Sequence, residues 1–397
     1  MNPRSQISVL LSALALGFLA CSSTPEEHGS TSAGGGGASS SGSADTSSSG
    51  ASTGGGGGGL PQAKHVVYLN FNGTVWTAGP DDAPARTSGI LAFGNQPKTV
   101  ISGFAAAIGP HPDSALRQAI ITKTTALVVA TLAPFDVSVT TRRPTVPFTE
   151  VVIGGSPDDV GAPSFAAGVA AGLDCDDANP ANTALVFADS GALLIPVDAD
   201  GAATVLASTA LHELGHTWGL AHTDDVADIM NPNNSASLKW GSGAVVGGTD
   251  TVETCGRATQ DSGALLMMHL GPHVERAEVP VVPAGKGPVV VGSTPVDAPE
   301  PGLATGTKLL PCLKLASSSN VLGAFAETWV QSSRWVRLSR GAQMGSASSV
   351  FQFDPVDTPP GLPMFERLAV IDAADDVTEV RAWLLPSGGG PVLPSCN

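Results

Sequence analysis

One short run of the chain holds histidines and a glutamate at a spacing suited to metal binding. His212 and His216 stand one helical turn apart, so both imidazoles project from one face and can share an ion. Glu213 adjoins the first histidine, where its carboxylate can reach a metal-bound water without taking a coordination position. Gly219 permits the positive φ that ends a helix, which lets His222 approach from a different direction. The run therefore predicts a centre with a facial set of nitrogen ligands.

Such a centre indicates hydrolytic chemistry. Three protein nitrogens leave a fourth tetrahedral position for water, and Zn²⁺ lowers the pKa of that water towards roughly 7. Glu213 is then the candidate general base, which takes a proton from the attacking water and passes it to the leaving amine. The expected cofactor is one catalytic zinc ion, and the expected mechanism is direct hydrolysis without a covalent intermediate.

Residues 212–222 fill every fixed position of the pattern H-E-x-x-H-x-x-G-x-x-H and resemble the active-site signature of the metzincin metalloproteases. Residues 228–232, Asp-Ile-Met-Asn-Pro, resemble the Met-turn of that family, and the short gap before them is most similar to matrixin-like members. The resemblance implies an endopeptidase that acts on proteins or peptides. It implies zinc ligands at His212, His216 and His222, a catalytic base at Glu213 and an apolar floor beneath the metal at Met230.

Two alternative functions stay open. One is a surface-anchored binding or adhesion lipoprotein with a vestigial zinc site, and the other, to which the metzincin pattern gives little weight, is a metal-dependent hydrolase that acts on something other than peptide bonds. Some metzincins use a tyrosine after the Met-turn as a further ligand; the only tyrosine of this chain is Tyr68, far upstream, which argues against that variant.

The elements that must position these residues are predicted from residue 60 onward. Their order is the one expected of a metzincin catalytic domain over residues 60–275: a twisted mixed sheet and an active-site helix. The expected strands are 65–71, 135–141, 150–153 and 183–187, and the expected helices are 113–132, with Asp113 as its cap, and 203–217. A third helix is expected within 250–270, with residues 260–270 as its apolar body.

The last part of the chain predicts a second unit. Residues 276–301 are rich in Pro, Val and Gly and indicate a linker, and residues 302–397 indicate a small β-rich domain, so the whole chain is α+β. Its strands are expected at 327–330, 335–338, 350–353 and 377–385. Trp329, Trp335 and Trp383 are interpreted as core residues rather than a carbohydrate platform.

The N-terminal residues predict export. Residues 1–20 carry Arg4 and then an apolar stretch too short for a membrane span, which is typical of a signal peptide. The sequence Phe-Leu-Ala-Cys ending at Cys21 resembles a bacterial lipoprotein cleavage box, so lipidation of Cys21 and location at the outer membrane or cell surface are expected. Residues 21–59 are nearly all Ser, Gly, Thr and Ala and predict a flexible tether.

The net charge of the chain limits the kinds of molecule that it can be expected to bind. The formal net charge of the 397 residues is −16 with only 19 Lys plus Arg, and no basic run occurs, which argues against nucleic acid. We expect a monomer. Calcium is an alternative second cation, because two acidic clusters could supply hard oxygen ligands. They are Asp174 with Asp176 and Asp177, and Asp198 with Asp200.

Four cysteines remain when Cys21 is set aside, and an even number in an exported chain favours two disulfides. The domain division selects Cys175 with Cys255 and Cys312 with Cys396. The alternative makes Cys175 an inhibitory zinc-binding thiol, as in matrixin propeptides, although the surrounding sequence lacks the basic residue and glycine of that switch.

Overall fold

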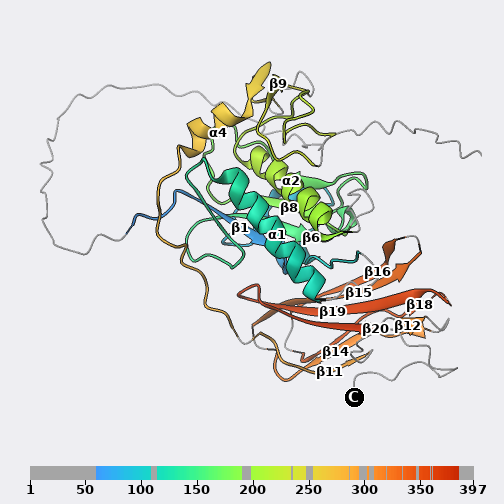
Figure 1. Ribbon diagram of the computed structural model, residues 1–397. Coiled ribbons are helices and arrows are strands. Elements are labelled where there is room, and N and C mark those ends of the chain that lie inside the picture. Colours follow the sequence, from blue (N-terminus) through green and yellow to red (C-terminus); the bar gives the residue numbers. More distant parts are fainter. Residues whose placement is uncertain are drawn as a thin grey trace, which may run out of the picture.

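The computed structural model describes residues 60–108, 114–189, 198–233, 236–246, 254–285, 287–294, 302–303, 308–318, 320–332, 334–345, 348–357, 359 and 361–383. The expected signal peptide, Cys21, the tether, the Asp113 cap and Cys396 lie outside these residues. Within them the α+β class is confirmed: a mixed sheet and its helices come first, and antiparallel strands follow (Figure 1). None of the described helices is long and apolar enough to cross a membrane.

The central sheet has the strand order β5-β1-β6-β8-β7. Its members are β5 (Val137–Thr140), β1 (His65–Asn70), β6 (Thr149–Gly154), β8 (Thr183–Phe187) and β7 (Gly168–Ala170). The first four are parallel, while β7 runs antiparallel to β8 at the edge. All residues of β1, β6 and β8 are buried, because layers cover both faces of the sheet.

Two helices, α1 (Ser114–Leu132) and α2 (Ala199–Thr217), lie side by side on one face of this sheet (Figure 1). Their buried residues share one apolar cluster with inward-facing residues of β1, β6 and β8. The expected helices and strands of this region are therefore present, with ends shifted by a few residues. The side chain of Asp198 caps α2 by accepting a hydrogen bond from the backbone N of Gly201 at 2.7 Å.

A small sheet covers the other face. It consists of β3 (Thr87–Ser88), β2 (Gly73–Ala78) and β4 (Lys98–Ser102), in the order β3-β2-β4. Trp76 and Ile101 of this sheet pack with outward-facing residues of β6 and β8. We did not expect these strands, since their short sequences alternate weakly.

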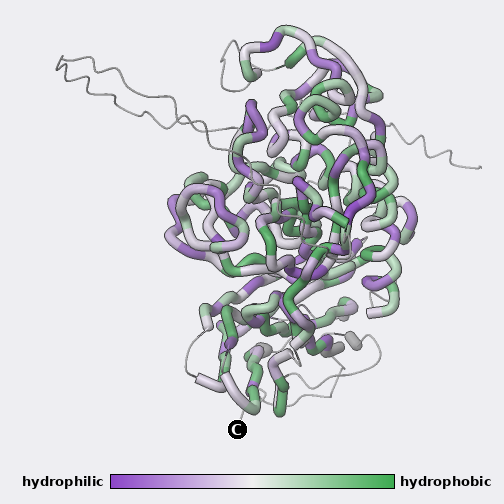
Figure 2. The backbone as a smooth tube through the Cα atoms, turned by 90° about the vertical axis from the view of Figure 1, so that its left-hand side faces the viewer, coloured by the Kyte–Doolittle hydropathy of each residue, from purple (hydrophilic) through white to green (hydrophobic). Residues whose placement is uncertain are grey.

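The C-terminal strands form a sandwich of two main sheets (Figures 1 and 2). Apolar residues such as Leu313, Phe351 and Leu368 fill the space between the sheets. The larger sheet contains β12 (Gly302–Leu303), β19 (Pro363–Asp372), β15 (Val321–Gln331), β16 (Trp335–Met344) and β20 (Val377–Trp383). The smaller contains β11 (Val290–Thr294), β14 (Cys312–Leu315) and β17 (Val350–Gln352), and β13 (Lys308–Leu309) pairs with β18 (Val356–Asp357).

The outer face of the larger sheet packs against the catalytic region. Phe325 and Ile371 from the sandwich share an apolar cluster with Val75 and Val100 of the β2–β4 sheet. Trp329 and Trp335 are buried in a second cluster, with relative exposures of 3% and 6%, which confirms their interpretation as core residues. The side chain of Trp383 is not described.

Buried charges join the same interface. Glu327 accepts hydrogen bonds from Arg337 at 3.0 Å and from Arg367 at 3.2 Å, and Arg367 also binds Glu379 at 2.7 Å. Arg337 reaches the catalytic region at Asp159, 3.4 Å away. Burial alone would raise the pKa of Glu327, but Arg367 and Arg337 hold it below its ordinary value.

Glu327→Gln removes the anion that these arginines share and should destabilise the fold by about 3–5 kcal/mol, because two guanidinium groups then stay buried without full compensation. The folded-state pKa of Glu327 is depressed. Its stabilising contribution is therefore fully present above the ordinary pKa of 4.5 and is lost as the pH falls through the folded value. Urea unfolding as a function of pH measures both effects.

The exposed Glu275 provides the control, since Glu275→Gln removes a negative charge without uncovering a buried cation. Equal unfolding free energies for the two variants would show that the buried ion pairs do not stabilise the fold.

Candidate metal centre

The three histidines converge on one point. The Nε2 atom of His222 lies 3.1 Å from Nε2 of His212 and 3.2 Å from Nε2 of His216. Among the described residues this is the only group of at least three His, Cys, Asp or Glu side chains whose ligand atoms all lie within 4.8 Å of one another. The structure thus brings together the three histidines that the sequence predicted as metal ligands.

The hydrogen bonds of the ring nitrogens fix their protonation. His212 donates from Nδ1 to the carbonyl of Ile229, and His216 donates from Nδ1 to the carbonyl of Leu220, both at 2.8 Å. A neutral imidazole that donates from Nδ1 carries a lone pair on Nε2. Burial also lowers the pKa of His216 to about 3, and that of His222 well below its ordinary value. Converging lone pairs repel one another unless a cation lies between them, so this donor set fits zinc.

The turn after α2 delivers the third ligand. Gly219 has a φ of +78°, and a Cβ atom there would lie 2.7 Å from the carbonyl oxygen of Asp174. Only glycine fits both the left-handed backbone and this close approach. The N–H of Leu220 then donates to the carbonyl of Gly215 at 2.8 Å. The turn directs the chain back towards the helix and places His222 beside His216.

Met230 packs closely against the catalytic helix. Its side chain is fully buried, and a Cβ atom on Gly215 would meet its Sδ at 2.4 Å. Gly215 immediately precedes His216, so the absence of a side chain there allows the methionine turn to reach the helix directly beside a ligand.

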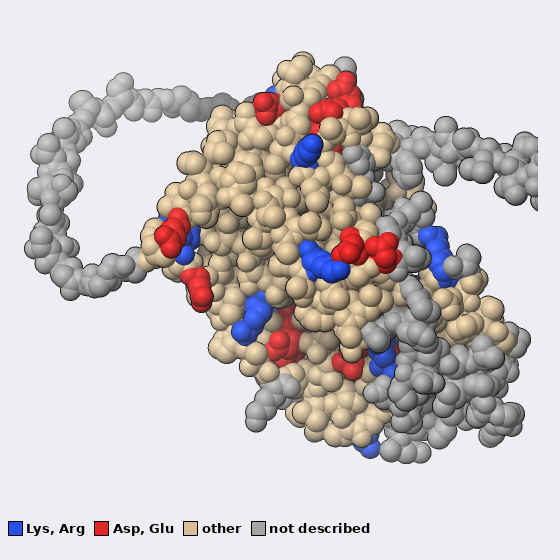
Figure 3. Space-filling view, viewed as in Figure 1, with Lys and Arg blue, Asp and Glu red and all other residues tan. Residues whose placement is uncertain are grey.

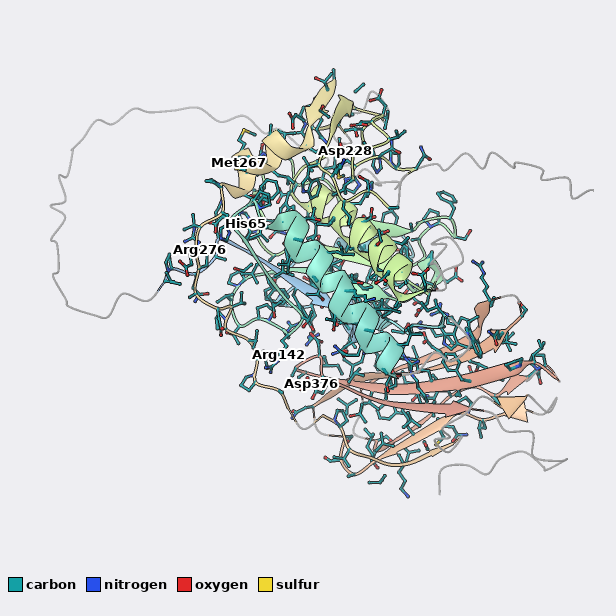
Figure 4. All side chains as sticks on the ribbon, in the orientation of Figure 1. His65, Arg142, Asp228, Met267, Arg276 and Asp376 are labelled. Carbon is teal, nitrogen blue, oxygen red and sulfur yellow. A yellow bond between two sulfur atoms is a disulfide. The ribbon has the colours of Figure 1, made fainter. Side chains whose placement is uncertain are left out.

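Sequence reasoning did not single out the polar network that supports this turn. Asp228 is fully buried, and its carboxylate accepts hydrogen bonds from the hydroxyls of Thr223 at 2.9 Å and Ser262 at 2.8 Å. It also accepts bonds from the backbone N atoms of Met230 at 3.2 Å and Gly241 at 3.0 Å. Figure 4 places Asp228 between α2 and the segment of β9 (Ser242–Ala244) and α4 (Ser262–Leu270). The feature of the sequence that could have predicted this network is the aspartate that begins the Met-turn.

Gln260, in β10 (Thr259–Asp261), holds the residue before the third ligand. Its amide accepts a hydrogen bond from the N–H of Ala221 and donates one to the carbonyl of the same residue, both at 2.9 Å. This pairing fixes the backbone beside His222 from a strand that is distant in sequence.

A disulfide joins the loops around the helix end. Cys175 is bonded to Cys255, which confirms the predicted pair and shows that Cys175 is not the inhibitory thiol of the alternative. Cys312 is also disulfide-bonded. Its partner is not among the described residues, so the pairing with Cys396 stays a prediction.

The acidic clusters considered for calcium serve local structure. Asp174 accepts hydrogen bonds from the backbone N atoms of Ala178 at 3.0 Å and Asn179 at 2.8 Å, and Asp198 caps α2. In neither cluster do three carboxylates of described residues converge on one point. His269 does not join the centre either: the group of converging ligand atoms contains His212, His216 and His222 alone, and Nδ1 of His269 donates to the carbonyl of Trp218 at 2.9 Å.

Glu213 lies beside the first ligand and faces the edge strand. It is buried, its Oε2 atom has no hydrogen-bond partner among the described residues, and burial raises its pKa to about 8. A Cβ atom on Gly168 of β7 would lie 2.5 Å from its Oε1. The candidate base and the backbone of the sheet edge are therefore in direct contact.

One comparison with known proteins agrees with this geometry. Residues 164–240, from the loop before β7 to beyond the Met-turn, match the Peptidase_M10 family model, described as Matrixin. The crystal structure of wild-type OgpA from Akkermansia muciniphila aligns with 82% of this chain and 92% of its own, at 13% identity and a TM-score of 0.21. A likeness this low carries no argument. No curated protein sequence matches the chain.

The His triad on its helix and the Matrixin match together define a metalloendopeptidase domain. More narrowly, it is a zinc metallopeptidase domain with zinc held by His212, His216 and His222, and its residues 164–240 are similar to the matrixin family.

Asp228→Asn tests the supporting network. The amide has one acceptor oxygen and an NH₂ group that would face existing donors, so the variant should lose about 1–3 kcal/mol of stability. It should also bind zinc roughly 10–100-fold more weakly, because the Met-turn carbonyl that orients His212 would shift. Chelator competition measures the zinc affinity.

Asp224→Asn is the matched control, because Asp224 is exposed in the same loop. If Asp228→Asn holds zinc as tightly as this control does, Asp228 does not position the ligands.

Proposed function

We propose that Glu213 is the proton-transfer group of this endopeptidase. The observation that carries the proposal is the place of its buried carboxylate, one residue from a ligand and with one oxygen that has no hydrogen-bond partner in the described part of the chain. Zinc, when bound, polarises the scissile carbonyl and lowers the pKa of water. The carboxylate accepts a proton from the attacking water and delivers it to the nitrogen of the leaving amine. Met230 provides the apolar floor beneath the triad.

The substrate is proposed to bind in an extended form along β7. This strand is the edge of the central sheet, and its residue Gly168 lies against Glu213. An extended peptide that adds to a sheet edge gains main-chain hydrogen bonds, whatever its side chains are. Glycine is needed at position 168 because a Cβ atom there would clash with Oε1 of Glu213. A peptide bound along this strand would therefore pass beside the carboxylate.

His216→Ala and Glu213→Ala should separate metal binding from proton transfer. The first removes a ligand nitrogen and with it most of the zinc. The second should retain zinc and fold, while peptide hydrolysis falls by about 10²–10⁴-fold, the usual range for loss of a positioned acid–base group. Zinc analysis and a peptide-library assay on the same samples provide the measurements.

Wild-type turnover by the Glu213 variant would refute the proposed role. If the unaltered, zinc-loaded chain fails to cleave any member of the library or a denatured protein, the alternative of a binding lipoprotein gains support instead.

For the segments on either side of the catalytic region, we propose the same roles that the sequence predicted. Residues 1–20 are a signal peptide, lipid is attached at Cys21, and residues 21–59 are a tether that holds a monomeric enzyme at the outer membrane or cell surface. The catalytic domain spans 60–275 and the β-rich domain 302–397. On the face drawn in Figure 3, Lys and Arg are scattered rather than clustered, which supports a protein substrate over nucleic acid.

Cys21→Ala should abolish lipoprotein processing and move the protein from the membrane fraction to the soluble fraction. Fractionation and mass spectrometry of the N-terminal peptide are the measurements. Ser22→Ala is the neighbouring control and should not change the distribution. An unmodified N-terminus in the unaltered protein would reject the anchor.

A further inference from the structure

A charged residue occupies an interior position of the C-terminal sandwich. Side chains alternate along β19, so Val370, Leu368 and Glu366 point to the same side. The first two are in the apolar core between the sheets, and Glu366 continues their row with a relative exposure of 0%. A carboxylate where the pattern requires an apolar residue is a local conflict, and such conflicts are expected at functional sites.

The partner strand satisfies only half of this carboxylate. Thr328 of β15 lies directly opposite Glu366, and its hydroxyl donates to Oε2 at 2.5 Å. The other oxygen, Oε1, is buried and has no hydrogen-bond partner among the described residues. Leaving an acceptor buried and unpaired costs roughly 1–3 kcal/mol, and more if it is charged. Glu366 therefore destabilises the sandwich if its role is only structural.

A pocket opens beside Glu366, where the sandwich ends. It encloses about 280 Å³, and its walls include Pro311 and Phe353 from the side of the smaller sheet. Leu338 of β16 also lines it, at a β-bulge where Thr328 pairs with Ser339 but Trp329 pairs with Arg337. Bulges of this kind often border functional sites, because they turn a side chain out of the regular pleat.

The charge around the pocket is negative. Asp354 and Asp357 line it together with Glu366. Its one basic lining residue, Arg340, lies opposite Glu327 on the face towards the catalytic region, and its Nη1 pairs with Asp159 at 3.0 Å. A ligand in this pocket therefore meets three acidic residues, while Nη1 and Nη2 of Arg340 are held by Asp159 and by the carbonyl of Val100.

We propose that this pocket binds a small organic cation, a primary ammonium on a short apolar stem such as a lysine side chain. The ammonium donates to Oε1 of Glu366, and the stem lies against Pro311 and Phe353. The volume is slightly below the roughly 300–1,000 Å³ of pockets for drug-sized ligands, which suits a ligand of side-chain size. Among the described residues no three acidic groups converge here as metal ligands would.

Calorimetry of the full chain with pentylammonium and with its neutral isostere 1-pentanol, at a pH above 8 where the carboxyl of Glu366 is ionised, tests the proposal. The ammonium should bind and the alcohol should bind at least about tenfold more weakly, because only a cation pairs with the buried carboxylate. Glu366→Gln should weaken pentylammonium binding by a similar factor and leave peptide hydrolysis unchanged. Asp372→Asn, the same chemical change at the end of the same strand and outside the pocket lining, should bind like the unaltered chain.

Each contrary result is decisive. The proposal is overturned if 1-pentanol binds as tightly as pentylammonium, or if Glu366→Gln binds pentylammonium as tightly as the unaltered chain does. It is also overturned if the chain binds calcium but not pentylammonium. Asp354→Lys places a cation on the exposed lining and should also weaken the ammonium, so it decides the case if Glu366→Gln does not fold.

Discussion

The catalytic region depends on holding three imidazole lone pairs on one point. Like partial charges repel at separations near 3 Å, so the arrangement survives folding only if the rings are held in place. Backbone carbonyls restrain two of the three rings, that of Ile229 for His212 and that of Leu220 for His216. Both carbonyls lie in turns that follow α2 rather than in the helix. The position of each turn is therefore a condition for metal binding, which explains why glycines and a buried aspartate accumulate there.

The distribution of buried charged groups shows where the fold tolerates the free-energy cost of an unpaired polar atom. Most buried ionic groups at the junction of sandwich and catalytic region have opposite partners, as Glu327, Arg367 and Glu379 do. Glu213 and Glu366 differ, since each has an oxygen without a partner among the described residues, as Asp177 and Asp189 also do. Burial raises the pKa of Glu213 and of Glu366 to about 8. In these two glutamates the unpaired oxygen belongs to a proposed site, where a ligand would complete the hydrogen bonding.

The sequence predicted the site better than the fold around it. Helical spacing placed His212 and His216 on one face, and the glycine signal foresaw the turn at Gly219, because both effects are local. β19 was missed although it lies between β15 and β20 in the larger sheet. Its run contains Glu366 and Arg367, which break the apolar pattern of a buried strand, and only partners from β15 and β20 make their burial tolerable.

The sequence by itself determined the metal ligands, the identity of the metal and the class of reaction, because the residue types and their spacing within one helix and one turn decide these. It also determined the Cys175–Cys255 pair. The tertiary structure decided what no local pattern contains: that Gln260 and Ser262 support residues about 40 positions earlier, that β7 brings Gly168 against Glu213, and that the sandwich shares a core with β2 and β4. These contacts join segments far apart in the chain, so their energies depend on packing and burial, which spacing along the sequence does not encode.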